Sequence, residues 1–444
     1  MPSYDRQHAV VLGGSIAGLF TARVLSDHFA NVTIVERDPV HDEPESRKGQ
    51  PQTRHLHGAL APTLNFIRTY MPGVEQALVE GGALVGDFGE KVRWFHAGQY
   101  RVEGHHLGIE GIVQSRPFLE WHVRRYVTGL KNVRLLAETA AEALVTDAER
   151  MRVTGVRVTH RDRGSEEVLP ADLVVDVTGR ASCTSKWLQQ LGYEAPEEEA
   201  VKVRVGYATR LYRRVVDPAC PPQSIFITPK TPNGKRGAIL FPIEGDRWIV
   251  TVGGWHGDHA PADADGFTEY VRTIGASDIY DVIVRAEPLS DVLLYKYPAS
   301  RRLRYERLKR FPEGLLVLGD AVASLNPIYG QGMSSAAKQV EVLTDVLKRG
   351  SLQGAWRGFF RRTAQVINQP WRVSVGEDFR YPETEGKAPF ALYPVNYYIH
   401  LVHQATYRDV VVYRQFVRVM HLLAPAASLM YPHIMLRVLR CALA

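Results

Sequence analysis

One stretch of the sequence decides the fold, GDAVASLNPIYGQGMS at residues 319–334. It follows the apolar run Leu315–Leu318, which predicts a buried strand, and from Ser334 onward apolar residues recur at helical spacing. Glycines let the backbone of the intervening loop approach a ligand closely, and the start of the following helix offers free N–H groups. An ordinary strand-loop-helix corner rarely needs the charge of Asp320 at its base, so we interpret the stretch as a ligand-binding loop.

A second glycine-rich turn lies near the start of the chain. The pattern there predicts a strand, a tight turn, a helix and a second strand at residues 8–12, 13–18, 19–28 and 31–35. This order is typical of a dinucleotide site, in which Glu36 would accept a hydrogen bond from a ribose hydroxyl. Gly13 and Gly18 keep the glycine pattern, whereas Ser15 replaces its middle glycine and is still small enough for a pyrophosphate to approach. The motif predicts a dinucleotide without distinguishing FAD from NAD.

Composition sets the broad class. The 444 residues are enough for two to three structural units, and an apolar fraction of 45% supports large cores. The 54 basic and 48 acidic residues give a formal charge of +6 without a long run of one sign, so no nucleic-acid partner is expected. Cys183, Cys220 and Cys441 lie far apart, which favours a reducing, cytoplasmic compartment and no metal site. We expect no signal peptide and no membrane span.

Two cationic segments leave alternatives open. Residues 47–58 (RKGQPQTRHLHG) concentrate cations and histidines in a loop, which either surrounds a phosphate or a ring edge, or is simply solvated. Ser115 and Pro117 predict the start of a helix, so Arg116 either reaches a cofactor phosphate or pairs with a surface acid. The arginine-rich segment 300–310 is interpreted as a solvated connector.

The middle and the end of the chain differ in pattern. Residues 201–255 alternate apolar and polar positions between Gly and Pro turns, which predicts a mostly antiparallel sheet. The last ninety residues are helical in pattern, with one apolar stripe at Val412, Phe416, Val419 and Leu423. We expect these helices to pack on the rest of the protein, with peripheral membrane contact or a partner helix as the alternative.

Taken together, these motifs resemble the FAD-dependent monooxygenases of the aromatic hydroxylase-like superfamily, over most of residues 8–350. The wording of residues 47–58 and 326–333 is most similar to a bacterial subgroup that includes hydroxylases and epoxidases. The resemblance implies that Glu36 binds the adenosine ribose, that Arg47 and Arg116 contact phosphate or ribityl groups, and that Asp320 binds the ribityl chain. The cofactor-binding residues are then Gly13, Ser15, Gly18, Glu36, Arg37, Arg47, Arg116, Asp320, Pro327, Gly330, Gln331, Gly332 and Met333.

The same resemblance implies the architecture, an α/β protein with a Rossmann-like FAD-binding domain, an inserted sheet domain for the substrate and a C-terminal helical region. We expect these units at residues 1–85, 110–200 and 300–350, at 86–109 and 201–299, and at 351–444. The activity implied is an oxidoreductase of secondary metabolism that inserts one atom of O2 into a hydrophobic small molecule, by hydroxylation or epoxidation through a flavin hydroperoxide. No side chain is assigned as a catalytic acid or base.

Two departures from the family pattern concern the reductant. Thr178-Gly179-Arg180 stands where aromatic hydroxylases have an Asp-Gly pair, and Ala323 replaces the usual histidine. NADPH or NADH would therefore reduce the flavin either directly or through a separate flavin reductase. The alternatives on this fold are an alkene reductase, a halogenase, or a flavin-binding protein without turnover. The Trp-x-Trp-x-Ile-Pro motif of the halogenases is missing among the seven tryptophans.

Overall fold

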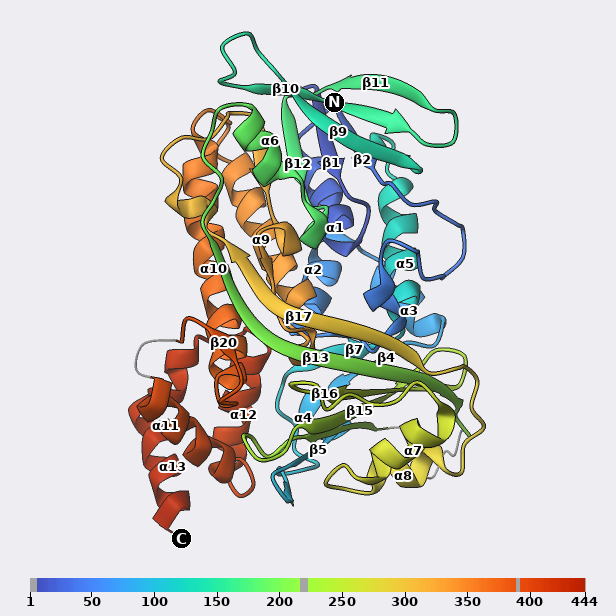
Figure 1. Ribbon diagram of the computed structural model, residues 1–444, viewed down its shortest axis with the longest axis vertical. Coiled ribbons are helices and arrows are strands. Elements are labelled where there is room, and N and C mark those ends of the chain that lie inside the picture. Colours follow the sequence, from blue (N-terminus) through green and yellow to red (C-terminus); the bar gives the residue numbers. More distant parts are fainter. Residues whose placement is uncertain (1–5, 216–222, 389–391, 444) are drawn as a thin grey trace.

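The structure is a computed structural model that describes residues 6–215, 223–388 and 392–443. A parallel sheet stands beside a large, mostly antiparallel sheet, and helices gather at the C-terminal end of the chain (Figure 1). The mixed α/β class and the antiparallel sheet expected between the two glycine motifs are confirmed. Cys220 lies outside the described residues.

Three distant parts of the chain build the parallel sheet. Its order is β18 (Leu315–Val317), β12 (Leu173–Asp176), β1 (His8–Leu12), β2 (Asn31–Val35) and β8 (Val133–Leu136). Every neighbouring pair is parallel, with Leu12 opposite both Asp176 and Val35. Because parallel strands end at the same edge, the segments that follow β1, β12 and β18 meet there.

Helices bury this sheet. They are α1 (Ile16–Leu25), α2 (Ala61–Tyr70), α3 (Val74–Glu80), α5 (Arg116–Thr128), α6 (Thr184–Gln190) and α9 (Gly332–Leu347). Pro72 lies in the break between α2 and α3, and Ser115 caps α5 as predicted, by accepting from the Phe118 N–H at 3.3 Å. The β1 residues Ala9, Val10 and Val11 are fully buried, so the core lies between the sheet and these helices.

Two small sheets flank the parallel sheet. One is the antiparallel sheet of β9 (Thr139–Thr146), β10 (Val153–His160) and β11 (Ser165–Pro170), which lies at the end of the molecule that holds the N-terminus (Figure 1). The other joins β3 (Gly58–Ala59), β7 (Glu110–Val113) and β4 (Leu84–Asp87), followed by α4 (Phe88–Lys91).

The large sheet has nine strands. Their order is β19 (Ala323–Ser324), β17 (Leu293–Leu303), β13 (Glu198–Arg213), β16 (Arg247–Gly254), β15 (Arg236–Ile243), β14 (Ser224–Thr228), β5 (Val92–His96) and β6 (Gln99–Tyr100), with β20 (Glu385–Gly386) also paired to β13. All pairs are antiparallel except β14 with β5. One face carries α7 (Ala264–Arg272) and α8 (Asp278–Ile283), which bury an apolar cluster around Phe267. The long strands β13 and β17 run from this sheet toward the parallel sheet (Figure 1).

Four further helices complete the chain, namely α10 (Ala355–Asp378), α11 (Leu392–Ala405), α12 (Val410–Met420) and α13 (Pro432–Leu443). The expected stripe of Val412, Phe416 and Val419 is buried against Trp94 and its neighbours, so the packing prediction is confirmed. Arg101, 2% exposed, ties β6 to α11 because its Nη2 lies 2.9 Å from the His403 Nδ1. Among the described residues, no helix is long and apolar enough to cross a bilayer.

The arginine-rich segment 300–310 is not a solvated connector, and that prediction was wrong. Its first part lies in β17, where Arg302 is 1% exposed and its Nη1 donates to the Asn368 Oδ1 at 2.9 Å. Arg304 pairs with Glu199 at 2.5 Å and with Glu306 at 3.2 Å. The acidic partners come from β13 and from the segment itself, so the sequence run alone could not reveal the pairing.

Candidate functional site

Two glycines make the first turn possible. Gly13 has a φ of +105°, and a Cβ there would stand 2.8 Å from the Val177 carbonyl oxygen. A Cβ on Gly18 would stand only 1.8 Å from the Gly13 carbonyl oxygen. No larger residue fits either position without moving backbone. The turn is so tight that α1 begins at Ile16, three residues earlier than expected.

Ser15 leaves the start of α1 open. It is the residue before the helix, with extended backbone, yet its hydroxyl does not cap α1 and instead donates to the Glu120 Oε2 at 3.0 Å. The N–H groups of the first helical turn therefore keep no side-chain partner from Ser15. Such a helix start binds anions through its N–H groups and its dipole.

Glu36 is held as a carboxylate at the end of β2. Its two oxygens accept from the Gly14 N–H at 2.9 Å and the Asp38 N–H at 3.0 Å, and it pairs with Arg47 at 2.7 Å. Burial raises the pKa of Glu36, but the Arg47 charge and these hydrogen bonds outweigh burial, so the pKa lies below its usual value. Neighbouring Arg37 is exposed.

Arg47 and Arg116 meet beside Ser15. The Arg116 Nη2 donates to the Ser15 Oγ at 3.0 Å, and the Arg47 Nη2 pairs with the Glu120 Oε1 at 2.5 Å. Glu120, 3% exposed, lies between the two arginines and also faces Arg124 at 3.8 Å. The sequence interpretation missed Glu120, although Arg116, Glu120 and Arg124 recur at the spacing of four that places side chains on one helical face. The acidic partner of Arg116 is buried rather than at the surface, so the surface-acid alternative is wrong, and the contact with a cofactor phosphate stays a prediction.

Asp320 lies where the last two motifs meet. It belongs to the 3-10 turn η4 (Gly319–Ala321), which packs against the turn η2 (Gly179–Ala181), so that a Cβ on Gly179 would stand 3.8 Å from the Asp320 Cβ. The Asp320 side chain is exposed, yet burial among surrounding protein raises its pKa, against the charges of Arg180 and Arg116. Exposure and desolvation together indicate a carboxylate set in a recess.

The loop of residues 327–333 presents backbone at the same edge. It begins with the 3-10 turn η5 (Pro327–Tyr329) and reverses at Gly330, which has a φ of +65°. Pro327, Gly330 and Gly332 are exposed, and Met333 is half-buried. The Gln331 side chain points away from this surface, because it is fully buried and its Nε2 donates to the Met420 carbonyl at 2.9 Å. Gln331 can therefore offer a ligand only its backbone.

Asp378, a buried carboxylate that the sequence did not predict, holds this loop in place from the protein interior. The Asp378 Oδ1 accepts from the Asn326 Nδ2 at 3.0 Å and from the Tyr329 hydroxyl at 2.9 Å. The Asn326 Oδ1 in turn accepts from the Tyr207 hydroxyl at 2.9 Å. Asp378 is fully buried at the end of α10, so one side chain links the loop to the large sheet and to the C-terminal helices.

The two histidines of the loop at residues 47–58, which we call the histidine loop, face the protein interior. His55 is 6% exposed and its Nδ1 lies 2.7 Å from the Thr209 hydroxyl of β13, while the His57 Nδ1 lies 2.9 Å from the His55 carbonyl oxygen. Burial lowers the pKa of His55 to about 4, and burial with the nearby Arg116 charge lowers that of His57 to about 3. Both imidazoles are neutral near pH 7, and of the two alternatives the solvated loop is wrong. Among the described residues, no three His, Cys, Asp or Glu side chains gather to hold a metal ion.

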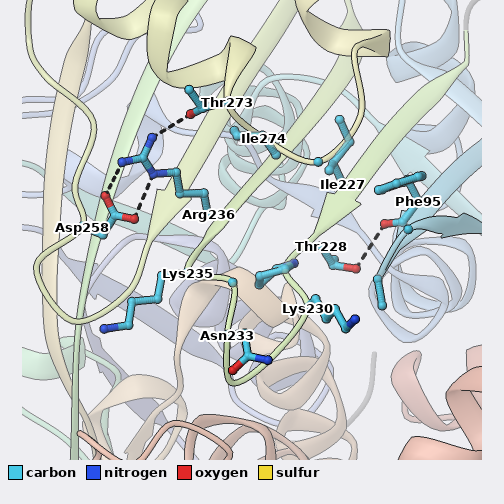
Figure 2. Close-up of a pocket in the computed structure, with 15 residues that line it drawn as sticks. Phe95, Ile227, Thr228, Lys230, Asn233, Lys235, Arg236, Asp258, Thr273 and Ile274 are labelled. Carbon is cyan, nitrogen blue, oxygen red and sulfur yellow. Dashed lines mark hydrogen bonds and ion pairs between the residues drawn. The ribbon is translucent and has the colours of Figure 1, made fainter.

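A surface pocket of about 490 Å³ lies elsewhere, between the 229–236 loop, the β5–β6 turn and the end of α7 (Figure 2). The guanidinium group of Arg236 in this pocket is engaged within the protein, because two of its nitrogens pair with Asp258 at 2.9 and 2.8 Å and a third donates to the Thr273 hydroxyl. Lys235 pairs with Glu383 at 2.6 Å. None of the glycine motifs lines this pocket, so we place the candidate site at the motifs.

The residues present fit a flavin dinucleotide. The open start of α1 and the two arginines suit a pyrophosphate, Glu36 lies at the end of β2, and the recessed Asp320 precedes a loop of exposed backbone. A parallel sheet with these features at one edge, beside a large antiparallel sheet, defines the fold of the FAD-dependent monooxygenases.

Comparison with solved structures confirms this fold. PqsL from Pseudomonas aeruginosa, a probable FAD-dependent monooxygenase, superimposes with a TM-score of 0.62 at 18% identity, covering 84% of this chain and 98% of PqsL. The flavin-dependent brominase Bmp2 gives a TM-score of 0.64 at 16% identity over 94% of each chain. A flavoprotein/dehydrogenase from Cytophaga hutchinsonii gives 0.66 at 14% identity, covering 97% of this chain and 96% of that one.

Sequence comparison identifies the family. Protein Rv3254 of Mycobacterium tuberculosis is 32% identical over 386 residues, which cover 85% of this chain and 81% of that protein. The chain therefore belongs to the same family as Protein Rv3254. No family model matches the chain.

Proposed function

We propose that the protein is an FAD-dependent monooxygenase that inserts one atom of O2 into a hydrophobic small molecule, by hydroxylation or epoxidation. One observation carries the proposal. The Gly13–Gly18 turn and Asp320 are about three hundred residues apart, yet they follow β1 and β18 at the same edge of one parallel sheet, and the Pro327–Met333 loop comes directly after Asp320 in the chain. When bound, FAD supplies the chemistry of oxygen activation, and the protein supplies binding, orientation and exclusion of water.

The proposed cofactor contacts follow from this arrangement. The N–H groups of α1, with Arg47 and Arg116, bind the pyrophosphate, and Glu36 accepts from the adenosine ribose. Asp320 accepts from the ribityl hydroxyls, and the backbone of the 327–333 loop covers the flavin ring. We assign residues 1–85, 110–200 and 300–350 to this cofactor unit.

We assign the substrate to the space between the loop of residues 327–333 and the large sheet. The substrate unit consists of residues 86–109 and 201–299. Tyr207 and Tyr295 stand on neighbouring strands with ring centroids 6.2 Å apart, and His55 is 5.5 Å from Tyr295. The sheet contacts the loop directly, because Tyr207 bonds to Asn326 and a Cβ on Gly253 would stand 3.0 Å from the Ile328 Cδ1. An apolar cluster around Phe241 lies on the same sheet and also contacts Leu56, which favours a hydrophobic substrate.

A protein of similar fold supports a small molecule as the substrate. PqsL has been solved in complex with 2-aminobenzoylacetate, so a protein with this architecture accommodates a compound of that size.

The source of electrons depends on the segment after β12. Arg180 is engaged within the protein, because its Nη1 donates to the Ala299 carbonyl at 3.0 Å and to the Ser324 hydroxyl at 2.8 Å. Its guanidinium also lies over the Tyr297 ring, 4.9 Å from the centroid. We propose that NAD(P)H is the reductant, and a flavin reductase the partner if direct reduction is slow.

The test combines a spectrum with oxygen consumption. The purified protein should show the visible absorption of FAD, or gain it on reconstitution. O2 uptake should require NAD(P)H, and it is measured both with and without added flavin reductase. A protein that binds no FAD overturns the proposal. Bound FAD without substrate-dependent O2 uptake across a panel of hydrophobic compounds supports a flavin-binding protein without turnover instead.

Halogenation is the second candidate, favoured by the similarity in fold to the brominase Bmp2. It predicts that product formation from an electron-rich aromatic compound requires bromide or chloride and that the product carries the halogen. Mass spectrometry of products formed with and without bromide separates the two activities, because a monooxygenase adds oxygen in both cases.

A further inference from the structure

The C-terminal helices leave an unusual amount of apolar side chain in solvent. Among the described residues, fourteen large hydrophobic side chains are exposed, and eight of them lie between residues 392 and 443. We call these eight the C-terminal apolar surface, which consists of Tyr393, Val395, Tyr397, Met430, Tyr431, Leu436, Leu439 and Leu443. The other six are scattered over the remaining chain, as single exposed hydrophobic residues usually are.

Helix α13 shows that this exposure has a pattern. Its inner side buries Ile434 and Val438. Leu436, Leu439 and Leu443, with exposures of 69%, 46% and 92%, recur at the spacing of three and four that places them on one outward face. The helix is thus apolar on two faces, and only one of them packs on the protein. It lies against α11 at an outer corner of the molecule (Figure 1).

The segment that carries the C-terminal apolar surface also carries an excess of positive charge. Residues 392–443 contain five arginines and a single acidic residue, Asp409. Asp409 pairs with Arg437 at 2.8 Å, whereas Arg440 and Arg418 are exposed. Exposed tyrosine, leucine and arginine on one short helical segment are the combination that lies in the headgroup region of a bilayer.

A pocket beside the surface adds a second feature. It has a volume of about 320 Å³ and lies between α12 and α13, where Arg414 and Arg418 line it together with Tyr431 and Ile434. Arg414 uses one nitrogen on the His106 carbonyl, at 3.0 Å, and is otherwise exposed. Two guanidinium groups beside an apolar wall suit a phosphate ester that carries a hydrocarbon chain.

We propose that the C-terminal apolar surface binds the face of an anionic phospholipid bilayer, with α13 in the plane of the interface. The twelve residues of α13 span about 18 Å, too short for a hydrocarbon core of about 30 Å, so the contact is peripheral. A second copy of this chain is the weaker occupant, because two such faces would each bring the same excess of arginine. The proposal does not depend on flavin chemistry and extends beyond the proposed function.

Vesicle sedimentation with the full-length protein tests the proposal directly. We expect binding to vesicles of phosphatidylcholine mixed with phosphatidylglycerol, much weaker binding to phosphatidylcholine alone, and a several-fold loss at about 1 M salt, where the screening length falls to about 3 Å. Absence of binding, or equal binding to both kinds of vesicle, overturns the proposal without any variant.

Matched variants locate the contact. Leu436→Asp with Leu439→Asp should lower partitioning to the anionic vesicles by roughly a hundredfold, and Arg418→Ala by about fivefold. Val168→Asp in β11 with Met151→Asp between β9 and β10 should leave it unchanged, because both positions are exposed and the β9–β11 sheet lies at the opposite end of the molecule from α13 (Figure 1). Equal loss in both double variants contradicts the assignment. So does a dimer seen by light scattering in the wild type and abolished by the α13 variant, since the surface would then bind a second copy.

Discussion

Replacement of Asp378 by asparagine should change how the stability of the protein depends on pH. Asp378 is fully buried, and its Oδ1 accepts from Asn326 and Tyr329. Burial and, to a smaller extent, the charge of neighbouring Glu377 raise the pKa of Asp378 from 3.8 to about 7, against the opposing effect of these hydrogen bonds. Asparagine keeps an oxygen for both donors and carries no charge, so it resembles the protonated acid.

The magnitude follows from the two pKa values. The folded protein keeps the Asp378 proton at pH values where the unfolded chain has lost it, so the stability contributed by this group falls as pH rises from about 4 to about 7. A difference between 3.8 and about 7 corresponds to about 4 kcal/mol, an upper bound for the change. Asp378→Asn should therefore gain stability relative to the wild type by up to that amount between pH 5 and 8.

Urea unfolding of both proteins at several pH values measures this difference, because titration of all other groups cancels in the comparison. Asp265→Asn, which removes an exposed carboxyl in α7, is the matched control for the change in net charge. Tyr329→Phe removes one donor to the carboxylate, which should raise the pKa of Asp378 further and extend the loss of stability to higher pH. A stability difference between Asp378→Asn and the wild type that stays constant from pH 5 to 8 would refute the reasoning.

Three further predictions concern the cofactor site. Gly18→Val should abolish FAD binding and weaken the fold, because its Cβ would stand 1.8 Å from a carbonyl oxygen, and reconstitution followed by the visible spectrum checks this. Asp320→Ala should raise the Kd for FAD at least tenfold in flavin fluorescence titrations while circular dichroism stays unchanged, since the lost contact is to the ligand. Glu120→Gln should destabilise the FAD-free protein by about 2–3 kcal/mol, because Arg47 and Arg116 lose a buried partner. Thermal unfolding should show a smaller loss when FAD supplies its phosphates, and equal losses with and without FAD would contradict this role.

Local patterns allowed much of the fold to be predicted. The strands His8–Leu12 and Asn31–Val35 fall where their apolar runs placed them, because a parallel strand that is buried on both faces is mostly apolar. The helix start at Ser115 was also predicted correctly, since an N-cap acts within one turn of helix. Prediction failed at the arginines of residues 300–310, and the sequence could not decide between the two alternatives for residues 47–58. Partners of both segments, Glu199 and Thr209, lie far away in the chain on β13.

The candidate site also has features that local sequence determines and features that only the tertiary structure determines. The sequence by itself determined the Gly13–Gly18 turn, Glu36 after β2 and the Gly319-Asp320 corner after β18. Each of these depends on backbone geometry within a few neighbouring residues. Only the tertiary structure placed Glu120 between Arg47 and Arg116, and Asp378 against the loop of residues 327–333. The apolar stripe of α13 likewise shows an exposed face only after the fold decides which side packs on α11. Charges and apolar faces take their role from the groups that folding brings beside them, and those groups are far away in the chain.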